Sequence, residues 1–236
     1  MTIDTRNPAT GEQLESYAEL TESEIETKLA KAADRYADWR QSDYKTRTDL
    51  LASIADAFES RSEELGRQIT LEMGKTFASA KAEAEKCATA FRFYAENGPA
   101  LLEDQPWERA DGKVYTRYLP MGPVLAVMPW NFPLWQAVRF LAPTIMAGNV
   151  GLLKHASVTM GCAELMDQVL RDAGAPEGLF QNLVIKSDAV AAIVSEHGGA
   201  TSHGAIFART LEIPAVTGVR GVQQSARVGE TVIVDG

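Results

Sequence analysis

The sequence predicts an α/β fold in which a layer of helices precedes a parallel β-sheet. Apolar residues recur at helical spacing from residue 25 to residue 95, as expected for helices that bury one face. Beyond residue 123, short apolar runs alternate with helical stretches in the order strand, helix, strand, helix, strand. Parallel sheets are built in this order, and continuous apolar runs are typical of strands covered on both faces.

The composition is that of an ordinary soluble protein with an acidic balance. The chain has 236 residues, of which 45% are hydrophobic and 23% charged, and its formal net charge is −9. No basic cluster is present, so we expect no nucleic-acid partner and no anionic membrane surface. The N-terminus lacks an apolar signal region, and prolines break the most apolar stretch, residues 124–150. We therefore expect no membrane association and a cytoplasmic protein.

The first hundred residues predict a turn and then helices. The turn lies at Asn7–Gly11, and Thr21 with Glu24 forms a capping box that begins the first helix. A glycine and a proline at positions 98 and 99 predict the end of the last helix. Cys87 and Cys162 lie far apart in helical sequence, so we interpret them as small buried apolar residues and expect no disulfide and no metal site.

The remaining sequence predicts alternating elements. They are an exposed strand at 113–118, buried strands at 123–128, 150–154 and 180–185, helices at 134–147 and 158–173, the start of a helix at 187–195, and strand-like runs at 213–219 and 231–234.

Two clusters of polar residues follow predicted strands, where ligands bind in parallel sheets. The first is Met128–Pro133, in which the Asn131 amide can donate to an oxyanion in a dry pocket. The structural alternative, that Asn131 caps the next helix, is equally compatible with the sequence. The second is Gly148–Ser157, in which a strand ends in Lys154. This lysine can reach cofactor ribose hydroxyls or phosphates, but the residues alone favour a solvated strand terminus.

Seven motifs resemble the aldehyde dehydrogenase superfamily, most closely its succinate-semialdehyde dehydrogenase branch. In chain order they are residues 7–11, Glu72-Met-Gly-Lys75, Pro120-Met-Gly-Pro123, Pro129-Trp-Asn-Phe-Pro133, Ala147-Gly-Asn149, Leu153-Lys154 and Gly174-Ala-Pro-Glu-Gly178. They follow the family's order and spacing over about four-fifths of the chain. The resemblance implies a partial Rossmann-like parallel sheet with N-terminal helices, and a strand pair that the family uses in subunit contacts.

The resemblance also assigns a cofactor site for NADP or NAD. Its residues are Met128, Pro129, Trp130, Lys154 and Ser157. Lys154 falls where the family contacts the adenosine ribose. Ser157 stands where many relatives carry a glutamate, and a neutral side chain there avoids repelling a 2′-phosphate. We therefore hypothesise that NADP is tolerated or preferred.

By the same resemblance, Asn131 stabilises the oxyanion of the substrate, a small-molecule aldehyde. Arg139 either meets a substrate carboxylate or forms a structural ion pair. The family also needs a nucleophilic cysteine, a glutamate base and a phosphate-binding Gly-Ser loop, all downstream of the matching part. Neither cysteine of this chain stands at the nucleophile's position, so we expect no turnover by the chain alone.

A second resemblance begins near residue 196. Gly198-Gly-Ala-Thr-Ser-His203-Gly-Ala-Ile-Phe-Ala-Arg209, followed by residues 211–216, resembles the mobile phosphohistidine domain of phosphoenolpyruvate-utilising enzymes. His203 would accept a phosphoryl group at the start of a helix whose free N–H groups hold phosphate. The structural alternative is an exposed histidine in a first helical turn.

We therefore divide the chain into an aldehyde dehydrogenase portion, residues 1–195, and a short β/α phosphohistidine-domain fragment, residues 196–236. Three hypotheses follow: an oxidoreductase portion without turnover, a phosphocarrier that uses His203, or a chimeric gene product without selected function. A homo-oligomer is compatible with the first hypothesis, although the family's dimer contacts also use a later strand that does not match here.

Overall fold

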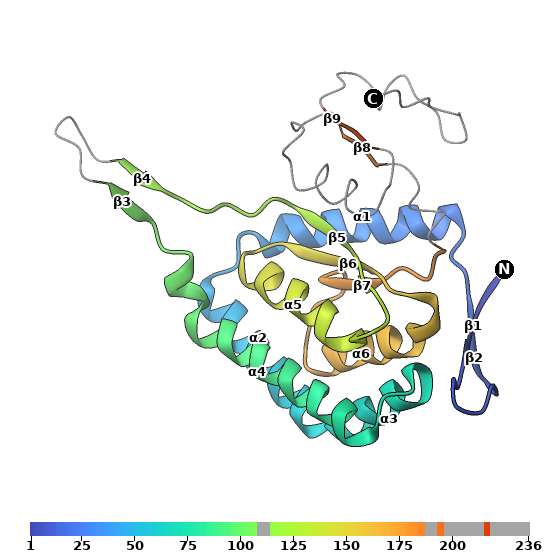
Figure 1. The fold of residues 1–236 in the computed structure, drawn as a ribbon. Helices are drawn as coiled ribbons and strands as arrows, with labels where there is room; N and C mark the ends of the chain where they lie inside the picture. Colours follow the sequence, from blue (N-terminus) through green and yellow to red (C-terminus); the bar gives the residue numbers. More distant parts are fainter. Residues whose placement is uncertain (108–113, 187–192, 196–214, 218–236) are drawn as a thin grey trace. The chain divides into compact units, whose positions relative to one another are not determined.

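The computed structural model describes residues 1–107, 114–186, 193–195 and 215–217 (Figure 1). The chain divides into two compact units, Met1–Val184 and Ile185–Gly236. Each unit is described by itself.

The first unit begins with an antiparallel hairpin of β1 (Thr2–Arg6) and β2 (Gln13–Ala18). The predicted turn lies between these strands, and Gly11 there has a φ of +76°. The sequence predicts the turn but not the strands. In β1 the buried side chains are Ile3 and Thr5, so the strand has too little apolar alternation to be recognised.

Four helices follow, as the apolar spacing predicts. They are α1 (Glu22–Trp39), α2 (Tyr44–Ser60), α3 (Ser62–Met73) and α4 (Phe77–Leu101). The capping box at α1 is confirmed: the Glu24 N–H donates to Thr21 Oγ1 at 3.3 Å, and the Glu24 carboxylate accepts from the Thr21 N–H at 2.8 Å.

The helices have a core of their own. Leu51, Ile54 and Phe58 of α2 are completely buried, as is Phe91 of α4. The Phe58 and Phe91 rings pack with their centroids 5.2 Å apart. Complete burial of side chains of this size stabilises a fold by about 1.5–3 kcal/mol each, so this packing is a major part of the unit's stability.

The end of α4 differs from the prediction, because the helix continues past Pro99 to Leu101. Proline removes one helical hydrogen bond, which alone would favour termination. However, a Cβ at Gly98 would lie 2.3 Å from Cγ of the buried Met146, so the glycine allows close packing there. The last turn therefore continues to Leu101 with Gly98 packed against Met146.

A second antiparallel hairpin, β3 (Gln105–Trp107) with β4 (Val114–Thr116), follows α4 (Figure 1). It confirms the central part of the exposed strand predicted at 113–118. Trp107, Val114 and Tyr115 are exposed. The strand β3 therefore shows no alternation of buried and polar residues from which it could be predicted.

The sheet has the predicted strand–helix alternation. Its elements are β5 (Pro123–Val127), α5 (Pro133–Met146), β6 (Val150–Lys154), the short 3-10 helix η1 (Ser157–Thr159), α6 (Met160–Asp172) and β7 (Phe180–Asn182). The strands are parallel in the order β5–β6–β7, and β6 is buried along its whole length. β7 is shorter than predicted, because at Val184 the chain leaves the ladder and its carbonyl accepts from the Leu20 N–H at 3.0 Å.

In the second unit, β8 (Ile193–Ser195) pairs in parallel with β9 (Ala215–Thr217). The helix predicted at 187–195 is wrong over β8, where the β-branched Ile-Val pair joins a ladder instead. The strand predicted at 213–219 is confirmed over β9. His203 and the run at 231–234 lie outside the described residues.

None of the helices in the described ranges is long and apolar enough to cross a membrane.

Candidate functional site

The carboxyl edge of the sheet brings the two predicted polar clusters together. Val127 and Lys154 are paired as the last residues of β5 and β6. The ladder continues one step further, because the Met128 N–H donates to the Lys154 carbonyl at 3.0 Å. The segments that begin at Met128 and at Lys154 therefore start side by side, as their positions after neighbouring parallel strands predict.

The turn between β5 and α5 presents two side chains to solvent. Trp130 is 52% exposed and Asn131 is also exposed. The N-cap of α5 is Phe132, which makes no side-chain cap, and Pro133 occupies the first helical turn. The alternative that Asn131 caps this helix is therefore wrong, and its exposed side chain lies in the turn after β5.

A buried glutamate binds the free N–H groups of α5 instead. Glu83 Oε1 of α4 accepts from the N–H groups of Leu134 and Trp135, both at 3.1 Å, and Glu83 is only 4% exposed. Its other oxygen pairs with Lys75. The Lys75 ammonium also lies 3.9 Å from the centroid of the Phe132 ring, so the cation contacts both the carboxylate and the turn.

The same arrangement recurs at α6. The two oxygens of Glu72, which is 3% exposed, accept from the N–H groups of Gly161 and Cys162, each at 2.8 Å. A Cβ at Gly161 would lie 2.6 Å from Glu72 Oε1, so only glycine admits the carboxylate this closely. Helix N-termini hold anions, and at both crossover helices this position is filled by a protein carboxylate.

His155, immediately after β6, connects the strand end to the start of α5. It is fully buried, its Nε2–H donates to the Pro133 carbonyl at 2.8 Å, and its Nδ1 accepts from the Thr159 hydroxyl at 2.9 Å. Burial lowers the pKa of His155 below its ordinary value, so the ring is neutral at neutral pH. The ring therefore links the segment after β6 to the first turn of α5 by a hydrogen bond.

The other predicted residues occupy different environments. Lys154 is 4% exposed, which is much less than the solvated strand terminus that was its alternative. Ser157 begins η1 and is half-buried, whereas Arg139 lies on the exposed face of α5. Lys154 and Ser157 lie in one short segment, and the first of these residues pairs with Val127 at the end of β5.

The interpretation of the cysteines as buried apolar residues is confirmed. Cys87 and Cys162 are both free and buried, and burial raises the pKa of each thiol well above its ordinary value. A nucleophilic cysteine needs the opposite environment, in which the thiolate is favoured. Neither thiol has the properties of a nucleophile.

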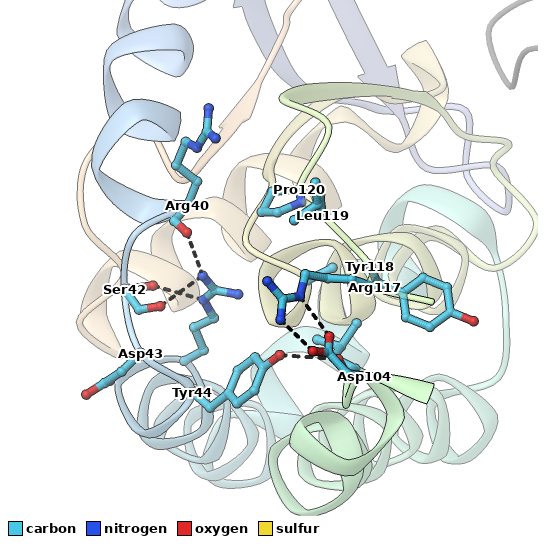
Figure 2. Close-up of a pocket in the computed structure, with 12 residues that line it drawn as sticks. Arg40, Ser42, Asp43, Tyr44, Asp104, Arg117, Tyr118, Leu119 and Pro120 are labelled. Atoms are coloured by element: carbon cyan, nitrogen blue, oxygen red, sulfur yellow. Dashed lines mark hydrogen bonds and ion pairs between the residues drawn. The ribbon is translucent and has the colours of Figure 1, made fainter. Parts of the chain in front are cut away.

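A cavity of about 420 Å³ lies elsewhere in the unit, among residues 40–47, 102–104, 117–120 and 147 (Figure 2). Pro120 and Ala147 precede β5 and β6, so this cavity lies at the amino edge of the sheet, not at the carboxyl edge. Three of its charged side chains have partners within the protein: Arg117 forms a bidentate pair with Asp104, and Arg47 donates to backbone carbonyls. We assign it no part in the candidate site.

Residues 1–184 thus define an α/β domain of the class that binds ligands beyond the carboxyl ends of parallel strands. More specifically, the chain belongs to the aldehyde dehydrogenase family, because the profile described as "Aldehyde dehydrogenase family" matches residues 1–201. A second profile, "PEP-utilising enzyme, mobile domain", matches residues 178–236. The two matches overlap, and both resemblances inferred from the sequence are confirmed.

Individual relatives point to one branch of the family. The chain is 50% identical over 199 residues to the NADP(+) succinate-semialdehyde dehydrogenase 1 of Mycobacterium tuberculosis, covering 83% of this chain and 44% of the relative. The corresponding enzyme of Mycobacterium leprae is 47% identical over the same shares of the two chains. The chain therefore spans less than half the length of these relatives.

Solved structures agree with the fold. The succinic semialdehyde dehydrogenase of Streptococcus pyogenes, crystallised with NADP+, superposes with a TM-score of 0.80 at 28% identity, covering 91% of this chain and 49% of that one.

Proposed function

We propose that residues 1–195 form the NADP- or NAD-binding portion of an aldehyde dehydrogenase that converts semialdehydes to carboxylates, and that the chain lacks turnover by itself. The main support is the match of residues 1–201 to the family, together with the adjacency of the Met128 and Lys154 segments. Relatives named as NADP(+) succinate-semialdehyde dehydrogenases favour NADP and a small aldehyde.

The proposed roles use the carboxyl edge. Asn131 donates its side-chain N–H to the substrate oxygen as negative charge develops, an interaction worth about 2.7–4 kcal/mol in related oxyanion sites. Trp130, with Met128 and Pro129 of the same turn, lines the cofactor site. Lys154 and Ser157 hold the adenosine ribose and its 2′-phosphate. Arg139, on the exposed face of α5, is proposed to meet a substrate carboxylate.

These residues fit the nucleoside end of such a cofactor better than its pyrophosphate. Lys154 supplies a cation and Ser157 a neutral hydroxyl, which suits a phosphorylated ribose. The N–H groups at the starts of α5 and α6 are already bound to Glu83 and Glu72, so neither helix offers them to phosphates. When bound, the nicotinamide cofactor supplies the hydride acceptor.

The proposed absence of turnover rests on the cysteines. Oxidation of an aldehyde in this family requires a thiolate that attacks the carbonyl carbon. Cys87 and Cys162 are buried with raised pKa values, so neither can form that bond. Steady-state assays with succinate semialdehyde and NADP should give no NADPH, and measurable NADPH formation would contradict this part of the proposal.

Thermal unfolding with and without millimolar NADP tests the cofactor site. A ligand present at about a hundred times its dissociation constant stabilises the native state by roughly 2.7 kcal/mol, so the midpoint should rise. Lys154→Met should lose this rise. Lys45→Met, which removes an exposed lysine of α2, should retain it. A cooperative transition that NADP does not move would refute the cofactor site while leaving the fold intact.

A second function, a phosphocarrier that uses His203, is favoured by the match of residues 178–236 to the mobile domain of PEP-utilising enzymes. A phosphoryl group would pass from phosphoenolpyruvate to an imidazole nitrogen of His203, leaving pyruvate. The chain should then acquire acid-labile phosphate when incubated with labelled phosphoenolpyruvate and a phosphotransferase preparation. His203→Ala should abolish the label and His197→Ala should keep it. Absence of label in the wild-type chain would refute this function.

The third hypothesis, a chimeric product without selected function, predicts that both tests are negative. NADP would not raise the midpoint, and His203 would not be labelled. A positive result in either test contradicts it.

A further inference from the structure

The Glu72-Met-Gly-Lys75 motif has no role in the proposed function, yet both of its charged side chains point into the protein. Glu72 is buried, and the Lys75 side chain is only 10% exposed. Gly74 between them ends α3 in the left-handed conformation with a φ of +80°. A Cβ there would lie 2.9 Å from Pro8 Cγ, so the tight turn depends on glycine.

The motif reaches both crossover helices of the sheet. Glu72 binds the first N–H groups of α6 directly. Lys75 acts at α5 indirectly, through Glu83. Its ammonium pairs with one oxygen of the Glu83 carboxylate, and the other oxygen accepts from the first N–H groups of that helix. Hydrogen bonds to a charged group are among the stronger ones in proteins, so both helix starts are held firmly.

At α5 this arrangement also fixes the turn that carries Trp130 and Asn131. Glu83 holds the N–H groups directly after the turn, Lys75 lies over the Phe132 ring, and His155 holds the Pro133 carbonyl. The side chain of Asn131 is exposed, so the backbone of the turn sets the point from which it projects. That backbone is in turn held by Glu83 and Lys75.

We propose that Glu83 and Lys75 are positioning residues for Asn131, fixing its amide at the carboxyl edge of the sheet. The role of Asn131 rests on the proposed function, but its positioning is a property of the protein without ligand. Glu72 provides a matched comparison, because its carboxylate makes the same kind of contact at α6 instead of α5.

The test compares Glu83→Gln with Glu72→Gln in the full chain without nucleotide, using ¹⁵N NMR of the backbone amides and of the Asn131 side-chain amide. Glutamine keeps a carbonyl oxygen that can accept from the same N–H groups, but it loses the pair with Lys75. In Glu83→Gln, the backbone order parameter of Asn131 should fall from about 0.85 to below about 0.6, and the chemical shifts of its backbone and side-chain amides should change. In Glu72→Gln, they should remain as in the wild type.

A second pair of variants keeps Glu83 in place. Lys75→Met should loosen Asn131 as Glu83→Gln does, and Lys75→Arg, which retains the cation, should restore the wild-type signals. This pair also decides the matter if Glu83→Gln does not fold.

Unchanged Asn131 signals in Glu83→Gln and Lys75→Met would overturn the proposal, as would equal disturbance in Glu72→Gln. Failure of the cofactor proposal can be distinguished from failure of this one. In that case the wild type would not bind NADP, while the spectra without nucleotide would still show the loss of order at Asn131 in Glu83→Gln and Lys75→Met.

Discussion

Replacing Gly148 with alanine should destabilise the first unit more than an ordinary substitution in a left-handed turn. Gly148 has a φ of +84° in the turn between α5 and β6. A Cβ there would lie 2.8 Å from both Nη1 and Nη2 of Arg47. The Arg47 guanidinium is buried and donates to the Met146 carbonyl at 3.2 Å and to the Ser42 carbonyl at 2.9 Å, so it cannot move aside without losing partners.

Two costs add in this variant. A left-handed backbone costs a residue with a Cβ about 1–2 kcal/mol. Displacing the guanidinium weakens at least one hydrogen bond of a charged group, which costs about 1.5–3 kcal/mol more. Gly148→Ala should therefore lower the free energy of unfolding by about 2.5–5 kcal/mol. For a unit of this size, each kcal/mol corresponds to about 2–4 °C in the midpoint.

Gly174→Ala is the control. Gly174 has a φ of +95°, but a Cβ there meets nothing within 4 Å, so only the backbone cost of about 1–2 kcal/mol applies. Urea unfolding followed by circular dichroism, with thermal midpoints as a check, measures both variants. Equal losses in the two variants would refute the collision with Arg47. A larger loss in Gly174→Ala would refute the use of these contacts altogether.

Three further predictions follow from the buried and edge residues. Cys87 and Cys162 should react with a disulfide reagent at pH 8 only after denaturation, because burial raises both thiol pKa values; rapid labelling of the native chain would contradict this. Because the pKa of His155 is lowered in the folded chain, the unfolded chain binds the proton more readily, and the free energy of unfolding should fall as the pH drops below about 6.5. His155→Gln should reduce this dependence of the free energy of unfolding on pH, measured by urea titrations between pH 5 and about 8. Ser157→Glu should weaken NADP binding by at least about tenfold relative to NAD in calorimetry, because a carboxylate repels the 2′-phosphate; an unchanged ratio would remove Ser157 from the cofactor site.

The sheet could be predicted because β5 and β6 are almost continuous apolar runs and the helices between the strands are amphipathic. Residues 123–127 and 150–154 form two of the expected strands, with 150–154 at the centre of the sheet. The two hairpins were harder to predict, because β1 and β3 have few buried side chains and their pairing depends on partners beyond a turn. The sequence predicts helix where β8 forms, since a short apolar run is compatible with either structure until its partner is known.

The candidate site divides in the same way. The place of Asn131 and Lys154 at the carboxyl edge could be predicted, because Lys154 ends one strand and Asn131 follows another, and a strand end is a local signal; their roles stay predictions. Glu83 binds α5 across 51 residues of sequence, and Glu72 binds α6 across 89, so their contacts have no local signal. One clue was present: position 83 falls on the apolar stripe of α4, between Ala80 and Cys87, where a lone carboxylate needs a buried partner.

The buried carboxylates also explain why the helices and the sheet form one folded unit. An α-helix leaves its first N–H groups without partners, and when buried these groups must be satisfied. At α5 and α6 the partners are Glu83 and Glu72 of the N-terminal helices. The reverse dependence is as strong, because a glutamate with 3–4% exposure needs those N–H groups to offset its lost hydration. The N-terminal helices are therefore not a separable layer: they complete the crossover helices, and through α5 they hold the turn on which the proposed chemistry depends.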